Sequence, residues 1–91
     1  MTFARGNFVV KNKLGLHARA AARLTQVASR YSCEVTVSRE GQNANAKSVM
    51  GVLLLCGAQG TTLEVEARGE GAEDAVRAIG ELIDDYFGEG G

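Results

Sequence analysis

The spacing of hydrophobic residues changes several times along this chain. Of all features of the sequence, these changes most limit the folds that the chain can adopt. Residues 33–38 (CEVTVS) and 61–69 (TTLEVEARG) alternate apolar and polar side chains, which predicts strands that bury one face. Residues 18–31 and 72–87 repeat apolar side chains every three or four positions, with Tyr86 at the end of the second stripe. This spacing predicts amphipathic helices. Each predicted helix and strand has one apolar side, so the chain must pack the apolar sides of its helices against the apolar face of a sheet.

Shorter segments complete the pattern. A strand is expected at about residues 2–11, and another at residues 43–47. The glycine turn REGQ connects residues 33–38 to residues 43–47 and so forms a hairpin. The apolar run VMGVLLLCG predicts a further helix, with Ser48 as its N-cap and Gly57 as its stop. The order is then β-α-β-β-α-β-α. We therefore expect the α+β class, as an open-faced two-layer sandwich with three helices covering one face of the sheet.

Length and charge restrict the functions open to such a domain. The chain has 91 residues, enough for one modest core, so we expect a single domain at residues 1–88 and a flexible tail at residues 89–91. Ten basic residues face 11 acidic ones, with a net charge of -1, which argues against a nucleic-acid footprint. The opening MTFARGNFVV lacks the pattern of a signal peptide, and no segment approaches the roughly 20 apolar residues of a membrane span. A cytoplasmic location is the expectation.

The two cysteines, Cys33 and Cys56, are too few and too unpatterned for a disulfide framework. Both are expected to be reduced and to lie in the core as small apolar side chains. No spacing of metal ligands such as C-x-x-C is present. We therefore expect neither a metal site nor a cofactor.

His17 is the only histidine of the chain, and it comes directly before the helix predicted from Ala18. One interpretation is structural, since the spacing of His17 continues the apolar stripe and its ring would close one end of the core. The other interpretation is chemical. Backbone N–H groups in the first turn of a helix lack acceptors, and the helix dipole is positive there. The dipole disfavours a proton on the ring by about 0.3–1 kcal/mol, and a neutral imidazole is a nucleophile.

Arg19 and Gly15 fit the chemical interpretation. Arg19 supplies a planar fork of donors that matches phosphoryl oxygens. Gly15 allows the backbone to turn closely before the helix. Together with His17, these residues predict a group that accepts a phosphoryl group, holds it and releases it.

Two stretches, GLHARAAA at residues 15–22 and AKSVMGVLLLCGAQG at residues 46–60, resemble the signature regions of the HPr family. This family comprises the small histidine phosphocarriers of the phosphoenolpyruvate-dependent phosphotransferase system. The resemblance implies that His17 takes a phosphoryl group on Nδ1 from phosphorylated enzyme I and passes it to IIA components of sugar permeases, while Arg19 steadies the phosphoryl oxygens. It also implies a four-stranded antiparallel sheet of order 1-4-2-3 and a stoichiometric carrier rather than an enzyme. Most members have proline where this chain has Ala20, a change expected to cost about 1 kcal/mol or less.

Ser48 has two compatible interpretations. A serine before an apolar helix is an ordinary N-cap. The resemblance implies that Ser48 matches a serine that HPr kinase/phosphorylase modifies in many members. A phosphate at Ser48 would add about two negative charges beside the partner contacts.

Partner proteins must reach His17, so we expect an apolar patch with a basic rim around it. The patch candidates are Ala18, Ala22, Val49, Met50 and Leu53, and the rim candidates are Arg19, Arg23 and Lys47. Core packing is the alternative for the three patch candidates of the second helix. The protein is expected to act as a monomer that binds its partners transiently.

Two other functions stay open. The chain could be a regulatory interaction module of a nitrogen-related or incomplete phosphotransferase branch, which signals through its phosphorylation state. It could also be a purely structural domain, in which His17 would be an inaccessible core residue.

Overall fold

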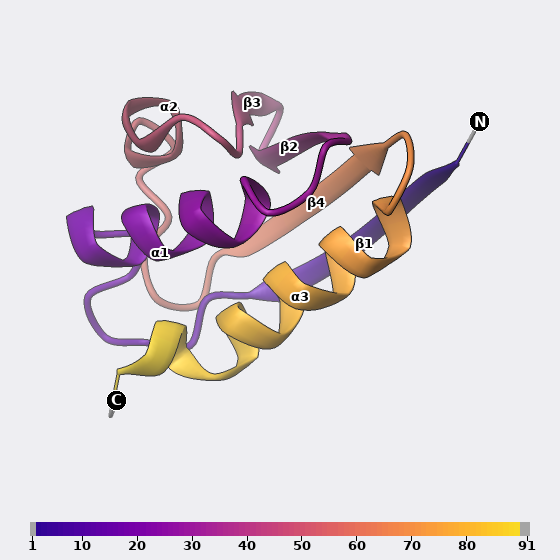
Figure 1. Ribbon diagram of the computed structural model, residues 1–91. Helices are drawn as coiled ribbons and strands as arrows, with labels where there is room; N and C mark the ends of the chain where they lie inside the picture. The colour runs from indigo at the N-terminus through magenta and orange to yellow at the C-terminus, as the bar shows by residue number, and fades with distance from the viewer. Residues whose placement is uncertain (1, 90–91) are drawn as a thin grey trace.

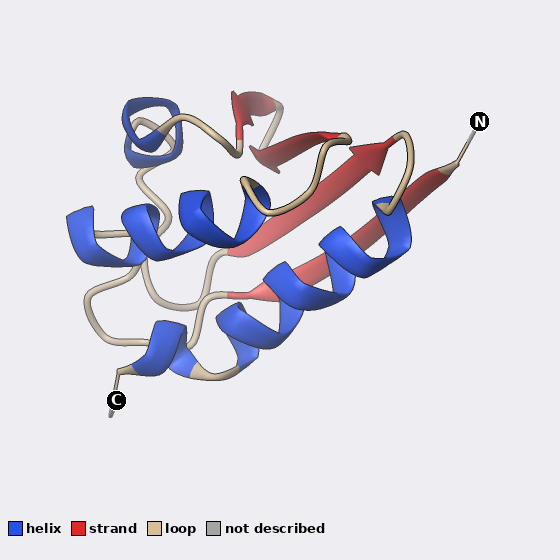
Figure 2. Ribbon diagram, in the orientation of Figure 1, coloured by secondary structure: helices blue, strands red, loops and turns tan. Residues whose placement is uncertain are grey.

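The computed structural model describes residues 2–89 and contains the elements in the predicted order. The strands are β1 (Phe3–Val9), β2 (Glu34–Arg39), β3 (Gln42–Asn45) and β4 (Thr62–Arg68), and the helices are α1 (Ala18–Ala28), α2 (Val49–Leu53), α3 (Ala72–Asp84) and the short η1 (Tyr86–Gly88). The four strands form one antiparallel sheet of order β1-β4-β2-β3. The helices lie on one face of this sheet (Figure 2). The predicted open-faced sandwich and its strand order are therefore confirmed.

The core lies between the sheet and the helices, as the two hydrophobic periods require. Strand β4 alternates buried and less buried residues, and its Val65 pairs with Gly6 of β1 and Val37 of β2. The residues with no exposed surface include Ala20, Ala21, Leu24, Ala28, Val37, Val52, Leu63, Val65, Ile79, Ile83 and Phe87. The stripes of α1 and α3 thus bury the sides that the sequence predicts.

Helix α2 ends before its predicted stop. It ends at Leu53 with Leu54 as its C-cap, so Gly57 does not stop it. Cys56, with a φ of 52°, is the residue that takes the left-handed conformation. The early end allows the chain to turn so that the Gly57 carbonyl accepts a hydrogen bond from the Leu16 N–H at 2.8 Å.

Helix α3 also ends before its predicted limit, at Asp84. Tyr86 is therefore not on its apolar stripe, and 40% of this residue is exposed. Tyr86 and Phe87 instead adopt left-handed φ angles of 58° and 54°. The turn carries the ring of Phe87 into the core, where it has no exposed surface.

The expectation for the cysteines holds for one of them. Cys33 is buried in the core, but Cys56 is exposed, so the prediction for Cys56 is wrong. The cause is the left-handed turn at Cys56, which follows the end of α2 and places Leu55, not Cys56, in the core.

Among residues 2–89, no helix combines the length and the apolar character needed to cross a bilayer.

Candidate functional site

His17 is the N-cap of α1. Its backbone is extended, and its carbonyl accepts the Ala21 N–H at 2.9 Å, which begins the helix. Its ring atom Nδ1 accepts a hydrogen bond from the Arg19 backbone N–H at 3.3 Å. The side chain of His17 is 24% exposed, so the ring is partly buried but still accessible to solvent. One ring nitrogen thus faces the N–H groups that open the helix, where an anion is stabilised.

The loop before His17 is fixed by a close backbone approach. Gly15 has a φ of 64°, and a Cβ at this position would lie 2.4 Å from the Gly57 carbonyl oxygen. Leu16 is 5% exposed and anchors the loop in the core. Only glycine satisfies both the left-handed φ and the missing space at position 15, so the entry to α1 is held against the segment that follows α2.

The C-terminal segment lies beside this loop, although the sequence gives no sign of it. Figure 1 shows the yellow C-terminal turn at the same end of the molecule as the start of α1. From this turn the carboxylate of Glu89 reaches both His17 Nε2 and Asn12 Nδ2, the latter at 2.9 Å. Glu89 is the first residue of the expected flexible tail, and residues 90–91 lie outside the described residues.

The surroundings of Glu89 shift the pKa of its carboxyl group. Burial by itself would raise the pKa of the Glu89 carboxyl, since its side chain is only 12% exposed. Hydrogen bonds from Asn12 and His17, together with the charge of Arg19 and that of the His17 ring in its protonated form, outweigh burial and lower this pKa below its ordinary value of 4.5. The carboxylate is therefore ionised at neutral pH and accepts hydrogen bonds without donating one.

Of the three basic residues expected around His17, two lie on α1 and the third is bound near the other end of that helix. Arg19 is exposed, two positions from His17. Arg23 is partly buried, because its guanidinium donates to the Phe87 carbonyl oxygen. Lys47 does not join them: its ammonium donates to the Tyr31 carbonyl oxygen at 2.7 Å, beyond the C-terminal end of α1. Since α1 has 11 residues and a helix rises about 1.5 Å per residue, Lys47 is held far from the start of the helix.

The apolar candidates form an exposed surface only in part. Met50 is 68% exposed and Val49 36% exposed on α2, and Ala18 is also exposed. Ala22 is half-buried, and Leu53 packs partly against the core. Two further side chains of this kind, Leu14 (72% exposed) and Leu54 (73% exposed), were not among the candidates, although Leu14 directly precedes the first motif and Leu54 lies within the second.

Ser48 is the N-cap of α2, as predicted. Its Oγ accepts the Gly51 N–H at 3.2 Å. Helix α2 lies against α1, at the end of the molecule where α1 begins (Figure 1). The serine is half-buried.

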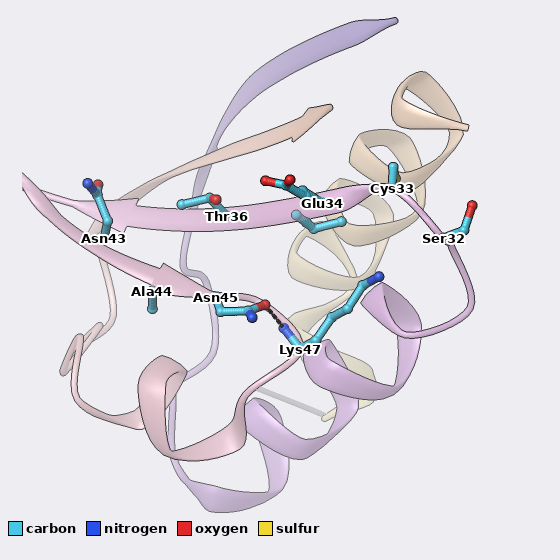
Figure 3. Close-up of a pocket in the computed structure, with 9 residues that line it drawn as sticks. Ser32, Cys33, Glu34, Thr36, Asn43, Ala44, Asn45 and Lys47 are labelled. Carbon is cyan, nitrogen blue, oxygen red and sulfur yellow. Dashed lines mark hydrogen bonds between the residues drawn. The ribbon is translucent and has the colours of Figure 1, made fainter. Parts of the chain in front are cut away.

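Two hollows on the described part of the surface lie away from His17. One of about 450 Å³ extends over β2, β3 and Lys47 (Figure 3). Another of about 510 Å³ shares Ser32, Cys33 and Glu34 with it. Neither is lined by His17, Arg19 or Ser48. Within residues 2–89, no cluster of three or more His, Cys, Asp or Glu side chains is arranged to hold a metal ion.

Two residues of this site could not be found from the sequence. Asn12 is completely buried, and its amide joins the Gly15 carbonyl, at 2.8 Å, to the Glu89 carboxylate. An asparagine in a loop and an acid in a glycine-rich tail carry no periodic signal. Their roles depend on a contact between residues 72 positions apart, that of His17 with Glu89.

Comparisons with known proteins bear on the family of this chain. Residues 4–85 match the family described as "PTS HPr component phosphorylation site". The phosphocarrier protein HPr of Neisseria meningitidis serogroup A is 48% identical over 79 residues, which cover 87% of this chain and 89% of the relative. The phosphocarrier protein NPr of Shewanella violacea is 39% identical over 89 residues, or 98% of each chain.

Solved structures give the same result. HPr of Thermoanaerobacter tengcongensis superposes with a TM-score of 0.91 at 40% identity, covering 94% of this chain and 97% of the other. HPr of Bacillus anthracis superposes with a TM-score of 0.86 at 30% identity, covering 91% and 99%. The chain therefore belongs to the HPr family, the phosphocarrier proteins of the phosphotransferase system.

Proposed function

We propose that His17 is the phosphoryl acceptor of this phosphocarrier, and that it receives the group on Nδ1. The observation that carries the proposal is the position of His17 as N-cap of α1, with Nδ1 turned to the Arg19 N–H. This nitrogen accepts a hydrogen bond, so it holds the lone pair that a nucleophile needs. The imidazole in this position is poised to attack phosphorus.

The transfer is a simple exchange at phosphorus. The Nδ1 lone pair of His17 forms a bond to the phosphorus of a phosphohistidine on enzyme I, and the donor's P–N bond breaks with its electron pair returning to the donor nitrogen. Once that lone pair is used, the Arg19 N–H is free to donate to a phosphoryl oxygen. When a IIA component takes the group, the Nδ1–P bond breaks and the pair returns to Nδ1. No free small molecule is turned over, so the protein acts as a stoichiometric carrier.

The exposed side chains around His17 support a role for partner proteins. Arg19 supplies a charge and a fork of donors for the phosphoryl oxygens. Ala18, Val49 and Met50, with Leu14 and Leu54, offer exposed apolar area on which enzyme I and IIA components would dock. Ala22, Arg23 and Leu53 would contribute at the edge of this area.

We further propose that Ser48 is a regulatory site for HPr kinase/phosphorylase. Its Oγ caps α2, so a phosphate there would lie beside the docking surface and repel acidic partners. The proposed functional unit is one domain of residues 1–88 acting as a monomer. A structure of HPr from Thermoanaerobacter tengcongensis described as a dimer, 42% identical with a TM-score of 0.76, covers 88% of this chain and 92% of that one, so the oligomeric state should be measured.

The test is phosphorylation with phosphoenolpyruvate and enzyme I. Because His17 is the only histidine, every phosphohistidine on this chain must lie there, and we expect an acid-labile adduct that is absent from His17→Ala. An adduct that persists in His17→Ala would overturn the proposal. Incubation with ATP and HPr kinase/phosphorylase should give an acid-stable adduct instead, lost in Ser48→Ala. An acid-stable adduct that persists in Ser48→Ala would remove Ser48 from the proposal.

The second candidate is a carrier of a nitrogen-related branch. The favouring observation is the similarity to NPr over 98% of both chains. The two functions differ in the acceptor, so the rate of phosphoryl transfer to a IIA component of a sugar permease should be compared with the rate to a nitrogen-branch IIA protein.

A further inference from the structure

The contact between the C-terminal segment and the imidazole is built into the fold. Tyr86 and Phe87 both adopt left-handed φ angles, a conformation that residues other than glycine rarely take. The turn is kept because the Phe87 ring is fully buried and the Arg23 guanidinium binds the Phe87 carbonyl oxygen. Gly88 continues the turn with a φ of 77°. Glu89 is therefore delivered to the site by a fixed part of the chain.

The carboxylate of Glu89 is held from two sides. Its Oε1 accepts a hydrogen bond from Asn12 Nδ2 at 2.9 Å, and its Oε2 contacts His17 Nε2. Asn12 is completely buried and also donates to the Gly15 carbonyl at 2.8 Å. The same amide thus fixes the loop that leads to His17 and the carboxylate that meets the His17 ring.

The partners of the two ring nitrogens define where the proton lies. Nδ1 accepts the Arg19 N–H, so in the neutral ring Nδ1 carries no proton. The partner of Nε2 is an ionised carboxylate, which only accepts hydrogen bonds, so Nε2 must donate. Both contacts favour the tautomer in which Nδ1 is the nucleophile.

From these contacts we propose that Glu89 is a positioning residue for phosphoryl transfer: it holds the proton on Nε2, and it stabilises the positive charge of the ring once Nδ1 is bonded to phosphorus. The inference rests on the proposed function, since it assigns a role at the same imidazole. The Nε2 proton stays on the ring throughout the cycle. Formation of the Nδ1–P bond leaves the ring with a positive charge, which the carboxylate offsets, and cleavage of that bond returns a neutral imidazole.

Glu89→Gln is the central variant, because it keeps the shape of the side chain and removes its charge. We expect phosphorylation of His17 by enzyme I to slow by about tenfold, the order seen when a partner that orients a functional histidine is removed. Glu89→Asp retains the charge on a shorter side chain and should recover part of the rate. Glu70→Gln is the matched control, since Glu70 is exposed and forms no ion pair within residues 2–89.

The decisive readout is the pH profile for hydrolysis of the phosphohistidine. Hydrolysis is faster when the ring is protonated, because the imidazole then leaves as a neutral group. Loss of the carboxylate should move the midpoint of this profile to lower pH by about one unit, a shift that corresponds to a tenfold change in proton affinity. A purely structural role would change the stability of the protein but leave the midpoint in place.

The outcomes separate the two proposals. Phosphorylation of wild type at His17 with an unchanged midpoint in Glu89→Gln would overturn the role of Glu89 and leave the proposed function intact. Absence of any acid-labile adduct on wild type would overturn the proposed function itself. Circular dichroism of each variant checks that it is folded. If Glu89→Gln does not fold, Glu89→Ala, which also removes the charge, replaces it: the inference requires the midpoint of Glu89→Ala to lie below that of wild type, and an unchanged midpoint would overturn it.

Discussion

Arg19 acts through two different groups, which can be separated by mutation. Its backbone N–H donates to His17 Nδ1 and survives any side-chain replacement, whereas its guanidinium is exposed. Arg19→Ala should slow phosphoryl transfer by about 10²-fold, the order lost when one donor to a developing anion is removed. The free energy of unfolding should change by less than about 0.5 kcal/mol. Rapid-quench kinetics and urea unfolding measure the two effects.

Arg30→Ala is the control for Arg19→Ala, since Arg30 is exposed beyond the other end of α1. It should leave both quantities unchanged. A loss of more than about 1.5 kcal/mol in Arg19→Ala, well outside the range for exposed positions, would show that Arg19 is structural.

Single residues also show where sequence reasoning stops. The prediction that α1 begins at His17 is confirmed by the cap geometry. This boundary could be predicted because the start of a helix depends on neighbouring residues of the chain. Lys47 and Cys56 differ from expectation because their environments depend on tertiary contacts. The Lys47 ammonium binds the Tyr31 carbonyl, and a left-handed turn exposes Cys56. Composition and spacing carry no information on either event.

At the scale of the element, Ser48 tests whether the cap of α2 and its regulatory role are independent. Ser48→Ala removes the acceptor of the Gly51 N–H and should lower the free energy of unfolding by about 1 kcal/mol. Ser48→Asp keeps a capping oxygen, so it should cost less than Ser48→Ala while weakening binding to enzyme I. Chemical denaturation and titration calorimetry measure these effects. Ser29→Ala is the control, because Ser29 is exposed and caps α1 through its backbone.

Gly15 joins the loop before α1 to the segment after α2. Gly15→Ala should lower the free energy of unfolding by at least about 2 kcal/mol, from the left-handed φ and the clash with the Gly57 carbonyl. Gly41→Ala is the matched control: Gly41 has a φ of 83° but open space around it, so only the conformational part of the cost applies. Equal losses in the two variants, measured by urea unfolding, would mean that the close approach contributes nothing.

The ends of the elements were the least predictable part of the fold. The predicted apolar stripe of α3 is correct as far as Ile83. The sequence offers no reason, however, to expect that Phe87 is buried and Tyr86 exposed. A left-handed turn inverts which side chain faces the core, and periodicity assumes right-handed backbone throughout. A left-handed residue also follows α2: Cys56 takes this conformation after the helix has ended at Leu53, and the next residue, Gly57, accepts the Leu16 N–H.

At the scale of the whole molecule, the order of elements and the sheet topology were predictable, and the composition of the site was not. Strands and helices that each have one apolar side, in this order, can form few layered arrangements. The family resemblance selects one of them. The site, however, is assembled from the loop before α1, the start of α1 and the C-terminal turn. The contact of His17 with Glu89 spans 72 positions, and no local pattern encodes it.

That contact links the C-terminus to the stability of the whole domain through pH. The lowered pKa of Glu89 means that its carboxyl binds a proton less tightly in the folded state than in the unfolded state. Its contribution to stability is therefore fully present above the unfolded value of 4.5 and is lost as pH falls through the lower, folded pKa. The titratable and charged groups facing Glu89 are the His17 ring and Arg19, and the neutral Asn12 amide completes its surroundings.

Unfolding of wild type and Glu89→Gln from about pH 7 to about pH 3 tests this linkage. The free energy of unfolding of wild type should exceed that of Glu89→Gln near neutral pH, and the excess should shrink as the carboxyl becomes protonated, since a protonated Glu89 resembles the neutral amide. Glu70→Gln should show no comparable trend, because Glu70 is exposed and precedes the start of α3, whereas Glu89 follows the end of that helix. An excess that stays constant down to the lowest pH would mean that the carboxylate charge does not stabilise the contact, and that the turn at Phe87 alone holds the C-terminal segment in place.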